Sequence, residues 1–274
     1  YFDIEFYADK LSYIIGEENI YFGMLLASHV RRLNVYSNNH FSNITMNEFT
    51  NLNGSNILKA VFNYAAKIRN NEFYYQDLSL YLKSKPHLTE KRLINLWRQG
   101  FISYDREIGL VQVLPKLNNY YYSQLKRSDF DEFSFNSLSR NSNNLIYNLN
   151  KNTMLFNGVE SVTLSKKNNI VVYPNNRTLV LKANREVNTT GDISVGNFDF
   201  KGVDLVFDYD SYLIQLKEID TLKMLTKKEA KDSYNYLYNI GGDLFINHPN
   251  NKSSKRNLEK FPYFISDKST KIFF

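Results

Sequence analysis

Histidine and aspartate are the residues of this chain that could, by type and spacing, build a metal or catalytic site. Zinc-binding histidines on a helix lie a few residues apart. The four histidines here are far apart in the sequence, at His29, His40, His87 and His248. Cysteine is absent, which excludes disulfides, thiolate zinc sites and cysteine nucleophiles. We therefore expect neither a metal site nor a bound cofactor.

Three aspartates alternate along one segment, as calcium ligands or paired catalytic carboxylates could: Asp204, Asp208 and Asp210. In a strand, this spacing places them opposite the apolar Leu205 and Phe207, so we interpret them as a solvent-exposed face. The chain has no acidic calcium loop, glycine-rich phosphate loop, nucleophile elbow or dinucleotide fingerprint. The sequence predicts a protein that is not an enzyme.

A set of basic and amide side chains could bind a nucleic acid. A predicted helix presents them on its polar face, at Lys91, Arg92, Asn95, Arg98 and Gln99. Acidic residues lie close to them in the sequence, at Glu90, Asp105 and Glu107, whereas phosphate neutralisation requires a face of one sign. We therefore favour a structural or protein-binding role for this helix over DNA binding.

The elements that must position this face are predicted helices between residues 55 and 100. The first carries an amphipathic stripe, at Ile57, Leu58, Val61, Phe62, Ala65 and Ile68. A second helix is expected at 75–82. Pro86 breaks the chain, and Thr89 is the predicted N-cap of a third helix that ends at Gly100. Strands at 101–104 and 110–113 then form a hairpin, and this order of elements is that of a winged helix.

The composition is that of a folded chain without a membrane-spanning helix. Its 274 residues are 43% hydrophobic, and the 21 Tyr and 20 Phe favour strands. The net charge of +6 comes from 34 basic and 28 acidic residues, and the basic residues are spread along the chain. No apolar run approaches the roughly 18 residues of a membrane span, and the mean hydropathy is −0.44.

One sequence unit recurs three times. Its pattern is Leu-x-aromatic-x-apolar, four mostly polar residues, then apolar-x-apolar, and the copies begin at Leu11, Leu145 and Leu205. Period-two spacing predicts that each copy is a β-hairpin. With the four central residues as the turn, the predicted cross-strand pairs are Ile15–Ile20, Tyr13–Phe22, Leu149–Met154, Tyr147–Phe156, Tyr209–Ile214 and Phe207–Leu216.

We expect a mostly β fold with an α insert: stacked antiparallel hairpins, as a rolled sheet or sandwich, plus a winged-helix-like helical subdomain. The expected divisions are a β-hairpin unit at 1–50, the insert at 51–128, a Ser- and Asn-rich linker at 129–144, and a β domain with two further repeats at 145–274. Because the chain opens on a strand without an initiator Met, we also expect that both ends were cut from a longer protein.

The first repeat resembles the repeating unit of OstA-like proteins, a lipopolysaccharide-transport family. The residues concerned are Phe6-Tyr7-Ala8-Asp9-Lys10-Leu11-Ser12-Tyr13, followed by Ile20-Tyr21-Phe22-Gly23. A divergent copy follows at 199–205. The layout, with residues 86–93 between β units, is similar to very large cell-envelope proteins of Bacteroidota. The insert has no counterpart in the OstA-like pattern.

The resemblance implies a periplasmic or outer-membrane-associated module of stacked strands, with a role in outer membrane biogenesis. Its apolar face could form a trough that shields lipid, lined by Phe6, Leu11, Tyr13, Ile20, Phe22, Tyr147, Phe156, Phe200, Phe207 and Leu216. The same bulky residues could instead fill a core. Other envelope proteins could dock on exposed strand edges. We expect a non-enzymatic structural or scaffold module, with a winged-helix nucleic-acid-binding protein as the alternative.

Overall fold

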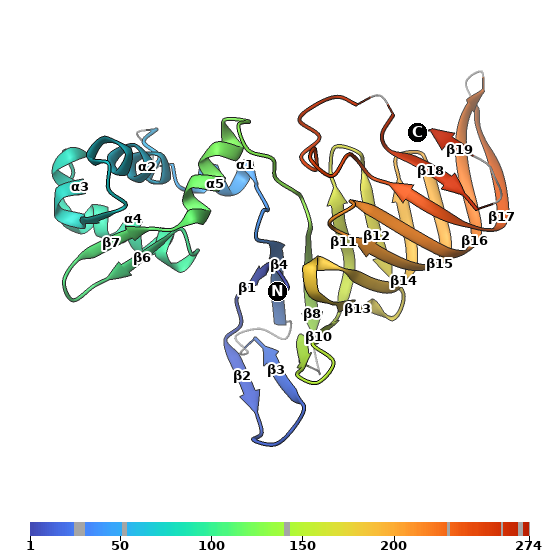
Figure 1. The fold of residues 1–274 in the computed structure, drawn as a ribbon, viewed down its shortest axis with the longest axis horizontal. Helices are drawn as coiled ribbons and strands as arrows, with labels where there is room; N and C mark the ends of the chain where they lie inside the picture. Colours follow the sequence, from blue (N-terminus) through green and yellow to red (C-terminus); the bar gives the residue numbers. More distant parts are fainter. Residues whose placement is uncertain are drawn as a thin grey trace. The chain divides into compact units, whose positions relative to one another are not determined.

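The computed structural model describes residues 1–24, 31–50, 54–139, 143–228, 231–258, 260–267 and 271–273. His29 lies outside them. The chain forms two compact units: unit 1 comprises Tyr1–His40 and Asp131–Phe274, and unit 2 comprises Phe41–Phe130. The fold is mostly β, with a large antiparallel sheet in unit 1 and the α-helices in unit 2, as the sequence predicts (Figure 1).

Unit 1 contains one large antiparallel sheet. Its strands in the described residues are β1 (Ile4–Phe6), β2 (Lys10–Tyr13), β3 (Asn19–Gly23), β4 (Arg31–Ser37), β8 (Ser134–Ser139), β9 (Leu145–Asn148), β10 (Thr153–Asn157), β11 (Val159–Ser165), β12 (Ile170–Pro174), β13 (Thr178–Leu181), β14 (Val187–Val195), β15 (Phe198–Asp208), β16 (Leu213–Lys228), β17 (Lys231–Phe245), β18 (Tyr263–Ser266) and β19 (Lys271–Phe273).

The sheet divides at β14 and encloses its own apolar face. The first residues of β14 pair with β13, and its last five pair with β12, so two branches leave the same side of one strand. One branch runs β12-β11-β8-β4-β1, and the other runs β13-β10-β9-β3-β2. Ring contacts join the branches: Phe135 to Phe156 at 4.9 Å and Phe6 to Phe22 at 5.5 Å between centroids. The branches therefore face each other across a shared core.

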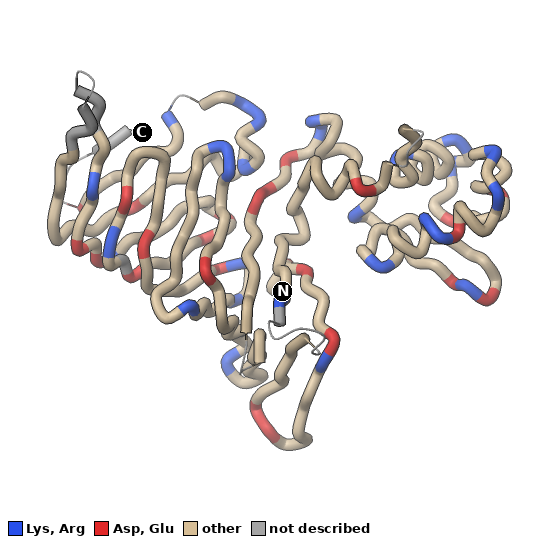
Figure 2. Tube along the Cα trace, turned by 180° about the vertical axis from the view of Figure 1, so that it is seen from behind, with Lys and Arg blue, Asp and Glu red and all other residues tan. Residues whose placement is uncertain are grey.

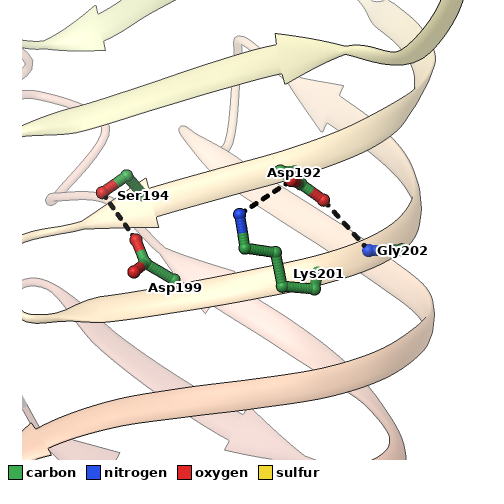
Figure 3. Close-up of polar contacts among 5 residues, drawn as sticks. All are labelled: Asp192, Ser194, Asp199, Lys201 and Gly202. Carbon is green, nitrogen blue, oxygen red and sulfur yellow. Dashed lines mark hydrogen bonds and ion pairs between the residues drawn. The ribbon is translucent and has the colours of Figure 1, made fainter.

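The long strands bend at bulges that contain glycine. In β15, Lys201 and Gly202 together oppose Asp192 of β14. Asp192 accepts hydrogen bonds from the Gly202 N–H at 3.2 Å and from the Lys201 ammonium at 2.8 Å (Figure 3). Farther along the sheet, Asp267 accepts from the Gly241 N–H at 3.1 Å. These carboxylates satisfy backbone donors that the interrupted ladder leaves without a strand partner.

The three repeats form hairpins β2–β3, β9–β10 and β15–β16, but the predicted register is wrong. The observed pairs are Tyr13–Ile20, Leu11–Phe22, Tyr147–Met154, Leu145–Phe156, Phe207–Ile214 and Leu205–Leu216. In the second and third copies, Asn148 and Asp208 bond backbone N–H groups of the turn and so start it one residue early. Because each partner moves by two residues, the apolar side chains keep their faces.

The predicted linker at 129–144 is wrong, because it contains β8, which pairs with β4 and β11. Its inward side chains are Phe135, Ser137 and Ser139, all buried. Because Ser137 and Ser139 are polar but point inward, the sequence lacks the alternation of apolar and polar residues by which a strand is predicted. Residues 140–142 lie outside the described parts. The predicted separation of 1–50 from 145–274 is also wrong, since strands from both ranges share one sheet, and unit 2 begins at Phe41.

Unit 2 contains the predicted series of three helices followed by a hairpin, and it adds two helices and a strand that were not predicted. It contains α1 (Asn43–Glu48), α2 (Ile57–Ile68), β5 (Glu72–Tyr74), α3 (Tyr75–Tyr81), α4 (Pro86–Arg98), β6 (Ile102–Asp105), β7 (Leu110–Val113) and α5 (Pro115–Gln124), with a sheet in the order β5-β7-β6. The predicted N-cap Thr89 is wrong: α4 starts after Lys85, and Thr89 is buried within the helix. Pro86 fits the first helical position, which needs no N–H partner.

Gly158 offers a test of the close approach between β8 and the turn before β11. Its φ is +73°, and an added Cβ would overlap the Leu138 carbonyl oxygen. Gly196 has φ +57° but no atom within 4 Å of such a Cβ. We expect Gly158→Ala to lower the free energy of unfolding by about 3 kcal/mol or more, and Gly196→Ala by about 1 kcal/mol. Urea denaturation measures both, and equal losses would contradict the proposed backbone overlap.

Candidate functional site

The predicted apolar face changes from core to surface along the sheet. Four of its residues are core, with exposed fractions of 0 or 1%: Phe156, Phe200, Phe207 and Leu216. Four more are half-buried: Phe6, Ile20, Phe22 and Tyr147. The remaining two, Leu11 and Tyr13 of β2, are 63% and 43% exposed. The structure thus does not bring the ten residues together as one open trough.

The three copies of the repeat show this change at matching positions. Leu11 is 63% exposed, whereas its counterparts Leu145 and Leu205 are 0% and 1% exposed. Ile15 is 93% exposed, and its counterparts Leu149 and Tyr209 are 40% and 3% exposed. The matching side chains are therefore buried in the core in the third copy and exposed to solvent in the first.

The exposed copy lies on a strand with one neighbour. In the part of the chain that the structure describes, β2 pairs with β3 alone and ends its branch of the sheet. Figure 1 shows the β2–β3 hairpin projecting from the rest of unit 1. The turn adds two apolar side chains, Ile14 at 64% and Ile15 at 93% exposure. We name residues 10–15 the β2 edge.

The second repeat shows how such an edge is covered. Strand β9 pairs with the other side of the first hairpin, β3, in antiparallel register. Ile20 then lies opposite Tyr147, and Phe22 lies opposite Leu145. The Asn148 amide donates to the Asn19 side-chain oxygen at 2.9 Å. One repeat therefore docks on another by backbone pairing and matched apolar side chains, which is the chemistry that the β2 edge also offers.

A buried polar cluster fixes the point where the chain leaves and rejoins unit 1. The fully buried Asp131 carboxylate accepts hydrogen bonds from the Tyr209 hydroxyl at 2.6 Å and the Ser37 hydroxyl at 2.8 Å. The Arg185 guanidinium lies 3.5 Å above the centre of the Tyr209 ring. The backbone of Asp131 also forms an isolated parallel β-bridge with the backbone of His40. The cluster ties four distant segments together, so it stabilises unit 1.

Burial raises the pKa of the Asp131 carboxyl, although the hydrogen bonds from Tyr209, Ser37 and the Phe133 N–H and the charge of Arg185 oppose the rise. The pKa of Tyr209 is raised by burial and then by the neighbouring Asp131. No sequence pattern links these residues, because they come from separate strands and turns.

Unit 2 divides the predicted recognition residues into two sets. Lys91, Asn95 and Arg98 are exposed along one side of α4. The Arg92 guanidinium instead donates to the Ser55 carbonyl oxygen at 2.8 Å, so this side chain holds the unit together. Gln99 is half-buried, and its main-chain carbonyl oxygen accepts a hydrogen bond from the Lys116 ammonium at 2.8 Å.

Two of the acidic residues near the recognition face, Glu90 and Asp105, accept local hydrogen bonds. Glu90 accepts a hydrogen bond from the Tyr104 hydroxyl at 3.0 Å, and burial followed by this bond raises the pKa of Tyr104 to about 12. Asp105 accepts from the Glu107 N–H at 2.9 Å within the β6–β7 turn. Unit 2 holds twelve basic and seven acidic residues, a net charge of +5 out of the chain's +6. The positive charge thus belongs mainly to this unit.

Within the described ranges, no three or more His, Asp or Glu side chains are grouped as metal ligands would be. Within the same ranges, no helix has the length and apolarity needed to cross a membrane. Among the alternating aspartates, Asp208 takes part in local structure: its carboxylate accepts hydrogen bonds from the Asp210 N–H at 2.9 Å and the Ser211 hydroxyl at 2.8 Å.

The Asp131 cluster predicts a pH-dependent stability. Because the folded-state pKa of Asp131 is raised, its contribution is fully present below the unfolded pKa and is lost as the pH rises through the folded pKa. We expect the free energy of unfolding of the wild type, minus that of Asp131→Asn, to fall as the pH rises from acidic values. Tyr209→Phe removes a hydrogen bond that favours the ionised Asp131 carboxylate and so raises the pKa of Asp131 further. In that background, the stability difference due to Asp131 should keep falling to a higher pH. Urea denaturation across pH measures both, and a difference that rises with pH would contradict this.

Comparison with known proteins adds no relative. No protein-family model matches the chain, no curated protein matches it, and no solved structure matches it.

Proposed function

We propose that the chain is a non-enzymatic scaffold module of a cell-envelope protein, and that it binds partner strands along the β2 edge. The observation that carries the proposal is the exposure of Leu11, which is buried at the matching position of both other repeats. The resemblance of residues 6–23 to OstA-like proteins supports an envelope location.

Strand addition fits the chemistry of this edge. An edge strand offers unpaired backbone N–H and C=O groups, and a partner strand satisfies them in register. Covering an exposed apolar side chain of this size contributes about 1.5–3 kcal/mol, so Leu11 and Ile15 could supply much of the affinity of a weak complex. The pairing of β9 with β3 within this chain is the internal precedent.

A more specific version of this proposal is that the module also shields lipid. The interior around Phe200 and Phe207 is filled by packed rings, with Phe200 5.4 Å from Phe264 and Phe207 6.0 Å from Phe133. A lipid chain would therefore be shielded at the half-buried end, near Phe6 and Phe22, beside the β2 edge. Photo-crosslinking of lipid at Phe22 but not at Phe207 would support that form.

Strand docking can be tested with a photo-crosslinking amino acid in the full-length parent protein. We expect crosslinks to a protein partner from position 11 or 13, and their loss when Ile15→Lys adds a charge to the edge. Position 36 is the matched control, since Tyr36 is 40% exposed on β4, a strand that has a neighbour on each side. Equal crosslinking from positions 13 and 36 would argue against a specific edge.

The envelope location has its own test. Cells expressing the full-length parent protein are fractionated, and cytosol, periplasm and outer membrane are blotted for it. We expect recovery in the periplasmic or outer-membrane fraction. Recovery in the cytosol would contradict the envelope proposal and leave the strand-docking test unaffected.

Nucleic-acid binding by unit 2 is a second candidate, favoured by its net charge of +5 and by the exposed Lys91 and Arg98 on α4. If it is correct, Lys91→Glu with Arg98→Glu should weaken binding to a 20-base-pair duplex by about 10-fold or more and reduce its salt dependence by roughly two ions. Lys67→Glu, on α2, is the control. Fluorescence anisotropy measures the duplex affinity of each variant. Equal losses of affinity in the two variants would indicate general charge attraction instead of recognition by α4.

A further inference from the structure

The outer face of the long strands, opposite the core, carries a row of exposed tyrosines. Tyr234, Tyr236 and Tyr238 alternate along β17 with exposed fractions of 44%, 47% and 61%. The Tyr236 and Tyr238 rings are nearly parallel, at 12° and 6.3 Å between centroids. The Lys223 ammonium lies 3.9 Å from the centre of the Tyr234 ring. Tyrosine favours strands, but strand stability alone does not require three such rings in solvent.

The face continues across the sheet as two rows of paired positions. One row runs from Tyr173 to its partner Asp192, then across the bulge to Lys201, and through Thr221 to Tyr238. It crosses four strand spacings, about 19 Å. The second row runs through Ser194, Asp199 and Lys223 to Tyr236. Exposed aromatic rings thus lie at both ends of the first row and at one end of the second.

The polar strip contains hydrogen-bond donors and acceptors without a dominant charge. Lys201 pairs with Asp192 at 2.8 Å, and the Ser194 hydroxyl donates to Asp199 at 3.0 Å (Figure 3). Figure 2 shows acidic and basic positions interspersed over these strands. Unit 1 as a whole holds 22 basic and 21 acidic residues, a net charge of +1. Such a surface gives a polyanion no advantage over a neutral ligand.

We propose that this outer face, centred on Tyr236, Tyr238 and the Asp199–Lys223 strip, binds a neutral linear polysaccharide. Sugar rings present C–H faces that stack on aromatic rings, and their hydroxyl groups both donate and accept hydrogen bonds. The tyrosines supply the first interaction, and the carboxylates, ammonium groups and hydroxyls supply the second. The face lies on other strands than the β2 edge, so this proposal does not depend on strand docking.

The test is native gel electrophoresis of the whole chain in gels containing dextran, hydroxyethylcellulose or mannan. At least one of these neutral polymers should retard the protein. Tyr236→Ala with Tyr238→Ala should weaken the retardation about 10-fold, whereas Tyr236→Phe with Tyr238→Phe should retain most of it, because the rings remain. Tyr7→Ala with Tyr74→Ala, which also removes two exposed tyrosines, is the matched control and should not change it.

Dextran sulfate separates neutral recognition from charge attraction, since it differs from dextran by its sulfate groups. Retardation by dextran sulfate alone would overturn the proposal. Retardation that survives the double alanine variant, or no retardation by any neutral polymer, would also overturn it. Self-association that the alanine variant abolishes in the absence of polymer would assign the face to a second copy of the chain instead. Thermal unfolding of each variant confirms that the sheet is intact.

Discussion

A sheet with one apolar face must cover that face, and unit 1 does so with the two branches of the same sheet. Because β14 pairs with β13 along its first residues and with β12 along its last, the branches leave one strand and come to face each other. The contact of Phe135 with Phe156 is a direct result of this arrangement. The core then depends on strands that bend, and bending requires interruptions in the hydrogen-bonded ladder.

Those interruptions explain several features of the outer surface. A bulge removes the strand partner of a backbone N–H, and Asp192 and Asp267 provide replacements at Gly202 and Gly241. Gly202 has φ +67°, a backbone conformation that L side chains rarely adopt, so the bulge also restricts residue choice at this position. A branched, bent sheet, unlike a closed barrel, still has ends. The exposed β2 edge follows from the same constraint as the core.

The sequence predicted which residues share a face more reliably than which residues pair. Period-two spacing located the hairpins, yet the side chains of Asn148 and Asp208 displaced the turns by local hydrogen bonds that the apolar pattern does not encode. Strand β8 escaped prediction because Ser137 occupies an inward position. The helical periodicity of α2 and the hairpin after Gly100 were sufficient to indicate the winged-helix order. The Asp131 cluster was not predictable, since its members are far apart in the chain.

The exposure of the candidate site depends on which strands surround each copy of the repeat. Leu11, Leu145 and Leu205 have the same residue type at the same place in the same pattern, yet their exposed fractions are 63%, 0% and 1%. The repeat therefore specifies a direction for the side chain, and the neighbouring strand or layer decides whether that side chain is covered. The third copy is enclosed between strands on both sides, whereas β2 has β3 on one side in the described residues. Leu11, whose counterparts are core in the second and third copies, would gain a similar free energy if it were buried. For that reason, an incoming strand at β2 would repeat, between molecules, the association by which the chain assembles its own sheet.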